Sequence, residues 1–287
     1  LTEAHKYFHF SNEKINNQIS FYWIRMMPKI INKFNFLPEK KKKIKKIKPI
    51  FIMGLPRSGS TLIESILCSG KKIIPNGGET TILNRVFLED NKKFFSEKKF
   101  LENDEKMHID KNSFVQKMIN QYTLLNLLNK NDENIFTDKS LENFFFVELI
   151  VKLFPYSKIV ICKRNIFQII MSMYQNFLPK IIWSHSIDNI LEYIDNYLKI
   201  IDNFKKKYPD KIYTIELDEL TRNPITISKD LFNFCNLEWD KKCLEFYKRS
   251  DLVSKTASNQ QVRYEIFNSK TKKYAAYKEF FHPYLNK

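Results

Sequence analysis

The residues best suited to chemistry lie in the segment 49–62, which reads PIFIMGLPRSGSTL. Gly54 and Gly59 bracket a short loop between a β-branched and aromatic run at 50–53 and an apolar run at 60–67. The first run predicts a buried strand, and the second predicts the helix that follows. A strand, a glycine-rich loop and a helix N-terminus together bind phosphate through backbone N–H groups and the positive end of the helix dipole. The segment therefore predicts an anion-binding loop.

One residue separates this loop from that of the nucleotide triphosphatases. Their pattern, G-x-x-x-x-G-K-[ST], places a lysine on the β- and γ-phosphates and a hydroxyl on Mg²⁺. Here Ser60 stands in the lysine position, and the cation of the loop is Arg57. We expect the loop to hold an anion without the lysine on which ATP chemistry depends.

A second candidate anion site follows another predicted strand, at 158–162. Arg164 comes directly after that strand, and Ser172 lies eight residues later, about two turns into a predicted helix at 167–177. Both side chains can face a ligand above the edge of the sheet, one as a fork-shaped cation and one as a hydroxyl donor. An arginine and a serine in these places are common, so the pair gains meaning only beside the first loop.

These motifs resemble those of sulfotransferases that use 3′-phosphoadenosine 5′-phosphosulfate (PAPS). The sequence PRSGST at 56–61 is similar to their 5′-phosphosulfate-binding loop, and Arg164 with Ser172 is similar to their 3′-phosphate-binding segment. Two further segments resemble the tyrosylprotein and bacterial tetratricopeptide-linked branches: NGGE at 76–79 and TDKSLEN at 137–143. A third, TASNQQVR at 256–263, resembles the bacterial branch. The resemblance covers roughly residues 49–287, and no tetratricopeptide repeat is visible in residues 1–48.

The resemblance implies a role for each matching residue. The PAPS site of this chain would bind the 5′-phosphosulfate through Arg57, Ser58, Gly59, Ser60 and Thr61. It would bind the 3′-phosphate through Arg164 and Ser172. Lys139 would stabilise the departing product, 3′-phosphoadenosine 5′-phosphate (PAP), and Glu79 would act as the general base, with Asp138 as its rival. Ser258 and Arg263 would contact phosphate or adenine. A sulfuryl group carries less negative charge than a γ-phosphoryl group, so fixed cations suffice and no metal is required.

The chain also departs from the family pattern. Asn165 stands where an aspartate often follows the 3′-phosphate arginine, and Gln175 replaces a further arginine of the tyrosylprotein branch. Lys255 and Lys272 could compensate for a looser grip. Histidine is the other familiar base in sulfotransferases, but we expect the candidates His108 and His185 to lie at the surface because the sequence around them is poorly patterned.

Composition narrows the class of protein. The 287 residues include 43% hydrophobic residues, which is typical of a globular protein. Their formal net charge of +16 is carried mostly by lysine and suits a solvated surface, a nucleic-acid or membrane partner or a polyanionic cofactor, so charge alone does not discriminate. The four cysteines show no metal-ligand spacing, and no N-x-[ST] site is present, which favours a cytoplasmic protein. No apolar run reaches the length of a transmembrane segment.

Short strands that alternate with helices predict an α/β fold, a P-loop-type mainly parallel sheet flanked by helices on both faces. We expect strands at 50–53, 158–162 and 211–216, a short strand at 72–75, a helical region at 88–130 and a helix at 144–154. Residues 49–287 would form one sulfotransferase domain. Residues 1–48 would comprise a short N-terminal helical appendage, interrupted at Pro28, and a basic linker.

The sequence leaves two other functions open. A P-loop nucleotide kinase or phosphotransferase would need the missing lysine and an acidic residue for Mg²⁺, a place that only Glu216 imitates. A basic nucleic-acid-binding module on the same fold would interleave aromatic and basic side chains. In the lysine run at 40–48, however, the only other residues are isoleucines, so no nucleic acid is expected. The acceptor could be a small molecule, a carbohydrate or a peptide. Residues 88–130 and 178–195 would shape its pocket, with the aromatic residues Phe87, Phe94, Phe177 and Trp183; the oligomeric state is not indicated.

Overall fold

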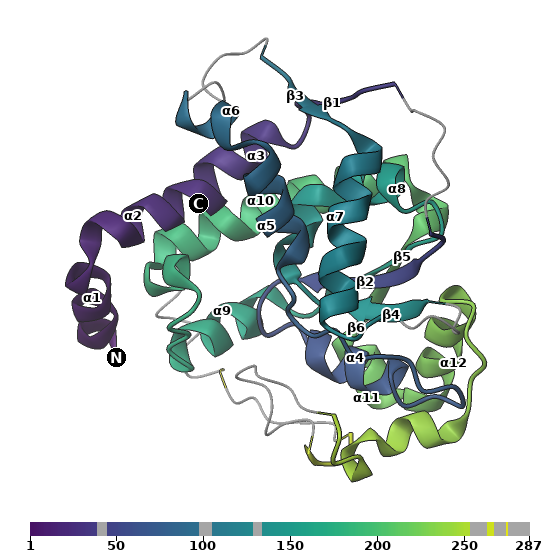
Figure 1. Cartoon of the computed structure of the whole chain (residues 1–287). Helices are drawn as coiled ribbons and strands as arrows, with labels where there is room; N and C mark the ends of the chain where they lie inside the picture. The colour runs from purple at the N-terminus through teal and green to yellow at the C-terminus, as the bar shows by residue number, and fades with distance from the viewer. Residues whose placement is uncertain (39–44, 98–104, 129–133, 253–262, 267–273, 275–287) are drawn as a thin grey trace.

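The computed structural model describes residues 1–38, 45–97, 105–128, 134–252, 263–266 and 274. Its centre is a four-stranded parallel sheet of order β4-β2-β5-β6 with helices on both faces (Figure 1). The strands are β2 (Lys48–Gly54), β4 (Ile135–Asp138), β5 (Lys158–Lys163) and β6 (Ile212–Glu216). The expected parallel α/β fold is confirmed.

The central strand β2 explains why its sequence is continuously apolar. Phe51 and Met53 point into one hydrophobic core, whereas Ile50 and Ile52 point into the other, and all four are buried. Successive side chains of a strand alternate between the two faces, so a strand covered on both faces needs apolar residues throughout.

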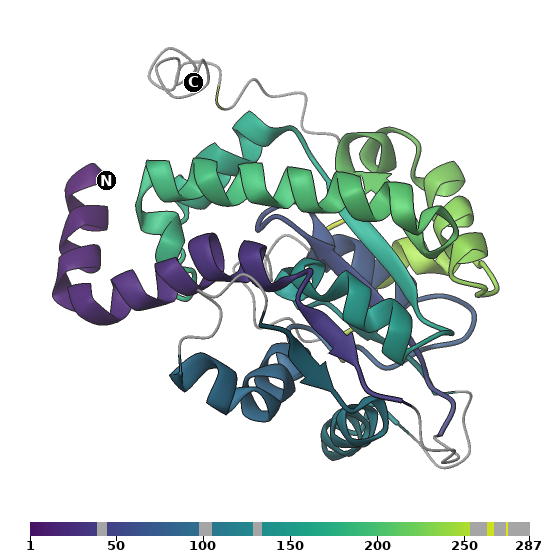
Figure 2. The same cartoon turned by 90° about the horizontal axis from the view of Figure 1, so that it is seen from above.

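Helices from different parts of the chain form the two covering layers (Figure 2). The Phe51 side packs against α5 (Ile82–Asp90), α7 (Lys111–Leu124), the 3₁₀-helix η3 (Leu141–Phe146), α8 (Val147–Leu153), α9 (Ile166–Gln175) and α10 (Ile187–Lys207). The Ile50 side packs against α4 (Ser60–Leu67), α11 (Leu217–Arg222), α12 (Pro224–Phe234) and the 3₁₀-helix η6 (Lys241–Lys248). Because all four strands run parallel, their carboxyl ends share one edge, where ligands of such sheets bind.

The N-terminal segment packs into the first core. It comprises α1 (Thr2–Ser11), α2 (Glu13–Phe21), the π-helix η1 (Tyr22–Met26), α3 (Met27–Ile30) and β1 (Phe34–Phe36), which pairs in parallel with β3 (Met107–Ile109). Met27 and Ile30 are fully buried in the same cluster as Phe51. The core therefore runs across residue 48, and the domain boundary placed there stays a prediction.

The expected interruption at Pro28 is wrong. The helical path continues through it, with the π-helix η1 immediately before and Pro28 in the first turn of α3. Proline cannot donate to the carbonyl four residues earlier, that of Ile24. Asn196 of α10 satisfies this carbonyl, with 2.9 Å between Nδ2 and O. A residue 168 positions further along the chain thus compensates for the proline.

Three expected elements need correction. Residues 72–75 form no strand, and the region 88–130 is not wholly helical, because it holds the short α6 (Lys92–Ser96), strand β3 and helix α7. The single helix expected at 144–154 is divided into η3 and α8. The structure also adds β4, whose sequence IFTD is too short and too polar to signal a strand. Pairing with β2 rather than local propensity makes it one.

Candidate functional site

Close packing determines the shape of the loop after β2. A Cβ atom on Gly54 would lie 2.7 Å from the carbonyl oxygen of Cys162 and 2.8 Å from Ser58 Oγ, so only glycine fits between β2 and β5. Gly59 has φ +93°, and Arg57 also adopts a left-handed conformation with φ +69°. Positive φ is uncommon and strained for a residue with a side chain, which is often a sign of a functional position.

The loop leads into the N-terminus of α4. Ser60 and Thr61 open this helix and are buried, and no side chain within the described residues caps it. The first N–H groups of a helix have no partner inside the helix and carry partial positive charge. The hydroxyl of Ser58 is buried and has no hydrogen-bond partner in the described part of the chain. An anion would satisfy the N–H groups at the start of α4, so the loop fits the phosphosulfate that its sequence predicts.

Two arginines from different strand ends meet at this loop. Arg164, directly after β5, donates from a terminal guanidinium nitrogen to the backbone oxygen of Arg57 at 2.9 Å. Arg57 donates from Nε to Ser172 Oγ at 3.0 Å, and Arg164 donates from Nε to Gln168 Oε1 at 3.1 Å. The two predicted anion sites therefore form one cluster. Ser172 holds Arg57 rather than Arg164.

The electrostatics of this cluster favour an anion. Burial lowers the pKa of Arg57, and the neighbouring Arg164 lowers it further. Burial also lowers the pKa of Arg164, while Tyr274 and Asp218 act in the opposite direction. Two half-buried guanidinium groups beside each other lose hydration and repel, and a doubly charged ligand removes both costs.

Asn165, the departure from the family pattern, has a structural role. It is the N-cap residue of α9, and its Oδ1 accepts the backbone N–H of Gln168 at 3.1 Å. An asparagine caps a helix as well as an aspartate does. The substitution therefore preserves the start of the helix that presents Ser172.

The candidate base and the candidate cation form an ion pair. Lys139, which follows β4, donates from Nζ to Glu79 Oε1 at 3.1 Å. The lysine side chain is 1% exposed and the glutamate side chain 44% exposed. Burial raises the pKa of Cys162 on β5, and the Lys139 charge opposes this shift. The arrangement offers a carboxylate open to an acceptor beside a buried cation at the same sheet edge.

Asp138, the rival carboxylate, has a different environment. It is fully buried, and its Oδ2 accepts from Tyr122 at 2.7 Å and from Thr80 at 2.8 Å. Its Oδ1 accepts from the backbone N–H and hydroxyl of Ser140 and from Asn143. Five donors leave no room for an acceptor hydroxyl. The contacts instead fix the end of β4 from which Lys139 projects.

Arg263, another predicted cofactor contact, lies away from this cluster. Arg263 is exposed and donates to the backbone oxygen of Arg249 at 3.4 Å, and Arg249 in turn contacts the carbonyl oxygen of Cys68 at the C-terminal end of α4. The structure does not bring Arg263 to the arginine pair, so its role stays a prediction. Ser258, Lys255 and Lys272 lie outside the described residues.

The histidine expectation is confirmed for one residue and wrong for the other. His108 is exposed on β3. His185 is buried, its Nδ1 lies 2.9 Å from His5 Nδ1, and its Nε2 lies 3.2 Å from the Leu178 carbonyl oxygen. The short segment around His185 shows no pattern because its partners come from α1 and from the residues that follow α9.

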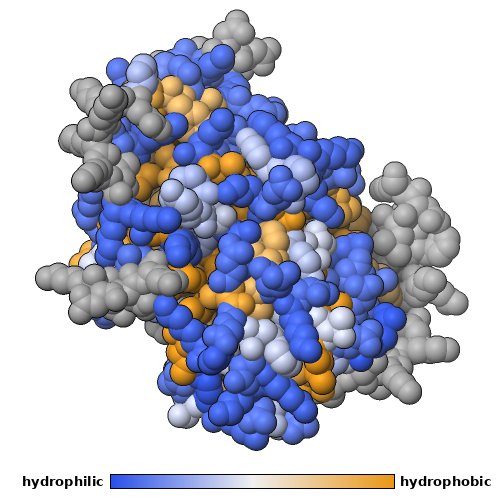
Figure 3. Space-filling model, turned by 90° about the vertical axis from the view of Figure 1, so that its right-hand side faces the viewer, coloured by the Kyte–Doolittle hydropathy of each residue, from blue (hydrophilic) through white to orange (hydrophobic). Residues whose placement is uncertain are grey.

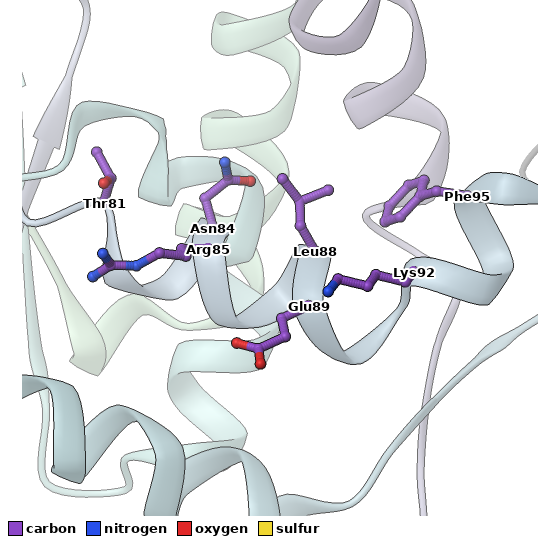
Figure 4. Close-up of a pocket in the computed structure, with 7 residues that line it drawn as sticks. All are labelled: Thr81, Asn84, Arg85, Leu88, Glu89, Lys92 and Phe95. Atoms are coloured by element: carbon purple, nitrogen blue, oxygen red, sulfur yellow. The ribbon is translucent and has the colours of Figure 1, made fainter.

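The aromatic residues expected near an acceptor belong mainly to the core. Phe87, Phe94 and Trp183 are buried in the first hydrophobic cluster, and Phe177 packs against the His5–His185 pair. A cavity of about 550 Å³ lies instead on the solvent side of α5 and α6. Figure 4 shows its lining from Thr81 to Phe95, with the Arg85 guanidinium directed toward the Thr81 end. Thr81, at one end of this lining, is two residues from the candidate base Glu79 along the chain.

Sequence reasoning missed Glu64, a fully buried carboxylate in α4. Its signal was present, because a charged residue within the apolar run LIESIL must find a buried partner. Sequence reasoning also missed Tyr22, which donates to Asn84 Oδ1 at 2.5 Å beside the cavity. No local pattern distinguishes Tyr22 from the other aromatic residues of the N-terminal segment.

The described residues contain no group of three or more His, Cys, Asp or Glu side chains arranged to hold a metal ion. Within the same residues, every helix is too short or too polar to cross a membrane. The face in Figure 3 is mainly hydrophilic, with small separate hydrophobic patches. It offers no broad apolar surface.

Comparison with known proteins places this geometry in context. Residues 49–241 match a sequence family described as "Sulfotransferase family". A relative from Aquifex aeolicus (strain VF5), an uncharacterised protein, is 30% identical over 297 residues that include 96% of this chain; the chain spans only 37% of that relative's length.

Two solved structures have a similar fold. The sulfotransferase domain of the Synechococcus PCC 7002 olefin synthase superposes with a TM-score of 0.55 and 16% identity, covering 81% of this chain and 89% of that one. The sulfotransferase domain from the curacin biosynthetic pathway gives a TM-score of 0.52 and 19% identity, covering 73% and 80%.

Proposed function

Because this chain belongs to the sulfotransferase family, we propose that it transfers the sulfuryl group of PAPS to a hydroxyl or amine acceptor. The observation that carries the proposal is the junction of Arg57 and Arg164 at the ends of neighbouring strands. A nucleotide with phosphate groups at both ends of its ribose requires two adjacent cationic sites. In this interpretation, the Arg57 loop binds the 5′-phosphosulfate and Arg164 binds the 3′-phosphate.

The ion pair between Glu79 and Lys139 supplies the remaining chemistry. Glu79 takes the proton of the acceptor hydroxyl or amine while the acceptor atom forms its bond to sulfur. Lys139 and Arg57 stabilise the negative charge that develops on the phosphate oxygen as its bond to sulfur breaks. The low exposure of Lys139 strengthens this effect, because a cation shielded from water acts through a lower dielectric.

We propose that the cavity along α5 receives the acceptor. Its volume lies within the usual range for small-molecule sites, and its lining combines Arg85, Glu89 and Lys92 with the apolar Leu88 and Phe95. Such a lining suits a hydroxyl-bearing acceptor, a small molecule, a carbohydrate or a peptide, with both a polar and an apolar side.

The N-terminal segment contacts this cavity through one of its lining residues. Tyr22 of the π-helix η1 holds the lining residue Asn84. Burial raises the pKa of Glu142, and the nearby Glu79 raises it further. Glu142 in turn acts on Tyr22, whose pKa is raised first by burial. Glu142 thus interacts electrostatically with both Tyr22 and the candidate base Glu79.

Calorimetry with PAP tests the donor site. We expect PAP to bind without Mg²⁺, and we expect Arg164→Ala to weaken binding about 10- to 100-fold, since a hydrogen bond to a charged group contributes about 1.5–3 kcal/mol. Lys163→Ala is the matched control, because Lys163 precedes Arg164 but lies exposed and pairs with Glu216. Equal effects of the two variants would exclude a specific role for Arg164.

The same titrations distinguish the alternatives. Binding of ATP that requires Mg²⁺ would support a nucleotide kinase, although Glu216 is engaged with Lys163. Binding of nucleic acid with strong salt dependence and without PAP affinity would support a basic binding module.

Glu79→Gln tests the base. We expect it to bind PAP normally while transfer of labelled sulfate from PAPS to a mixture of acceptors falls at least about 100-fold. Undiminished transfer would show that another group accepts the proton.

A further inference from the structure

A buried carboxylate joins the donor loop to the catalytic pair. Glu64 lies one turn beyond the residues that open α4, and it is 2% exposed. Burial raises its pKa, while Lys139, Thr137 and the Gly78 N–H act in the opposite direction. A carboxylate in such a place is costly unless it is bonded on several sides.

The contacts of Glu64 lead to both members of the catalytic pair. Its Oε1 accepts the backbone N–H of Gly78 at 3.0 Å and the hydroxyl of Thr137 at 2.8 Å. Gly78 precedes Glu79 directly, and its carbonyl oxygen accepts the backbone N–H of Lys139 at 2.8 Å. One oxygen atom therefore ties helix α4 to the base segment and to the end of β4.

We propose that Glu64 is a positioning residue that couples occupation of the donor loop to the placement of Glu79 and Lys139. The inference rests on the proposed function, because it takes the N-terminus of α4 as the donor site. Helix α4 moves as a rigid unit, so an adjustment of the loop around a phosphosulfate displaces Glu64, and Glu64 carries Gly78 and Thr137 with it. Donor and base are thereby aligned through one contact.

The chemistry of the side chain explains why an apolar residue would not serve. Without an acceptor at this place, Gly78 N–H and the Thr137 hydroxyl lose a buried partner. Thr137 Oγ1 also accepts the Gly77 N–H at 3.1 Å, so the loss would extend along the base segment. Glutamine keeps an oxygen of the same reach, whereas alanine removes it. A shift of about 1 Å at a catalytic group can lower turnover about 100-fold.

Hydrogen–deuterium exchange of the peptide that contains residues 77–81, measured with and without PAP, tests the coupling without knowledge of the acceptor. In the native chain we expect PAP to slow exchange there. Glu64→Ala should abolish this protection while PAP affinity changes less than about threefold, and Glu64→Gln should restore it. Ser65→Ala is the control, because Ser65 is the next residue and is also buried.

The second measurement is turnover, the rate at which the protein converts PAPS to PAP with water as the acceptor. Glu64→Ala should lower kcat about 100-fold with KM for PAPS nearly unchanged, and Glu64→Gln should recover most of the loss. If Glu64→Ala does not fold, Glu64→Asp, whose shorter side chain withdraws the oxygen, takes its place. If the folded Glu64 variant keeps both the PAP-induced protection and the native kcat, the inference is wrong. Failure of the native chain to bind PAP would instead overturn the proposed function.

Discussion

Two neighbouring glycines allow a sharp test of how the proposed base, Glu79, is placed. An ideal Cβ on Gly77 would lie 2.0 Å from the backbone oxygen of Thr137, whereas real Cβ atoms essentially never approach closer than 3.0 Å. A Cβ on Gly78 would meet nothing within 4 Å, but Gly78 has φ +60°. At Gly77 a side chain is therefore excluded by lack of space, whereas at Gly78 it is disfavoured by the backbone conformation.

The two alanine variants should therefore differ. Gly77→Ala must move the segment away from the end of β4 by about 1 Å, which breaks the Gly77 contact with Thr137 and the Gly78 contact with Glu64. Such a shift is expected to lower kcat about 100-fold and to cost about 1–3 kcal/mol of stability. Gly78→Ala should cost about 1–2 kcal/mol, the penalty for a left-handed residue, with turnover reduced only a few-fold.

The assay pairs urea unfolding with conversion of PAPS to PAP. Stability alone does not separate the variants, because the two ranges overlap; the ratio of their kcat values does. PAP titration shows whether the donor loop is intact, and we expect it to be so in both. The reasoning is refuted if folded Gly77→Ala turns over as fast as Gly78→Ala.

Two further predictions concern other parts of the structure. Burial lowers the pKa of His5, and it lowers that of His185 to about 4, so the stability that they contribute is complete above pH 6.5 and is lost as the pH falls from 6.5 toward 4. Urea unfolding should show this loss of stability in the native chain and a smaller loss in His185→Gln. The control is His108→Gln, because His108 is exposed. If the free energy of unfolding depends on pH equally in His185→Gln and in the native chain, the prediction is wrong. Ser172→Ala removes the partner of Arg57 Nε and should weaken PAP binding about fivefold in calorimetry, since a net hydrogen bond contributes about 1 kcal/mol; unchanged affinity would show that Arg57 is held by other contacts.

The features readable from the sequence were those that depend on neighbouring residues. The helix expected at 60–67 has those bounds in the structure, and the strands expected at 50–53, 158–162 and 211–216 lie within or overlap β2, β5 and β6. The segments 50–53 and 159–162 are wholly apolar, whereas Thr214 interrupts the third strand and Glu64 and Ser65 interrupt the helix. Strands covered on both faces encode their burial locally, so their prediction needs no knowledge of the partner.

The missed features depend on partners far along the chain. β4 is a strand because β2 lies beside it, and the helix passes Pro28 because Asn196 satisfies the carbonyl of Ile24. His185 is buried because α1 covers it. In each case the local sequence is neutral or misleading, and the deciding contact spans more than 80 residues.

The absent lysine at position 60 illustrates how strand order supplies what a motif lacks. In the order β4-β2-β5, the residues that follow the three strand ends include Lys139, Arg57 and Arg164. A phosphate-binding loop with its own lysine concentrates charge at one point, whereas here three cations come from three adjacent strands. Lys139 is buried against the Glu79 carboxylate rather than carried at the start of α4. A cation that follows a neighbouring strand can hold Glu79 and, in the proposed mechanism, also stabilise the departing phosphate.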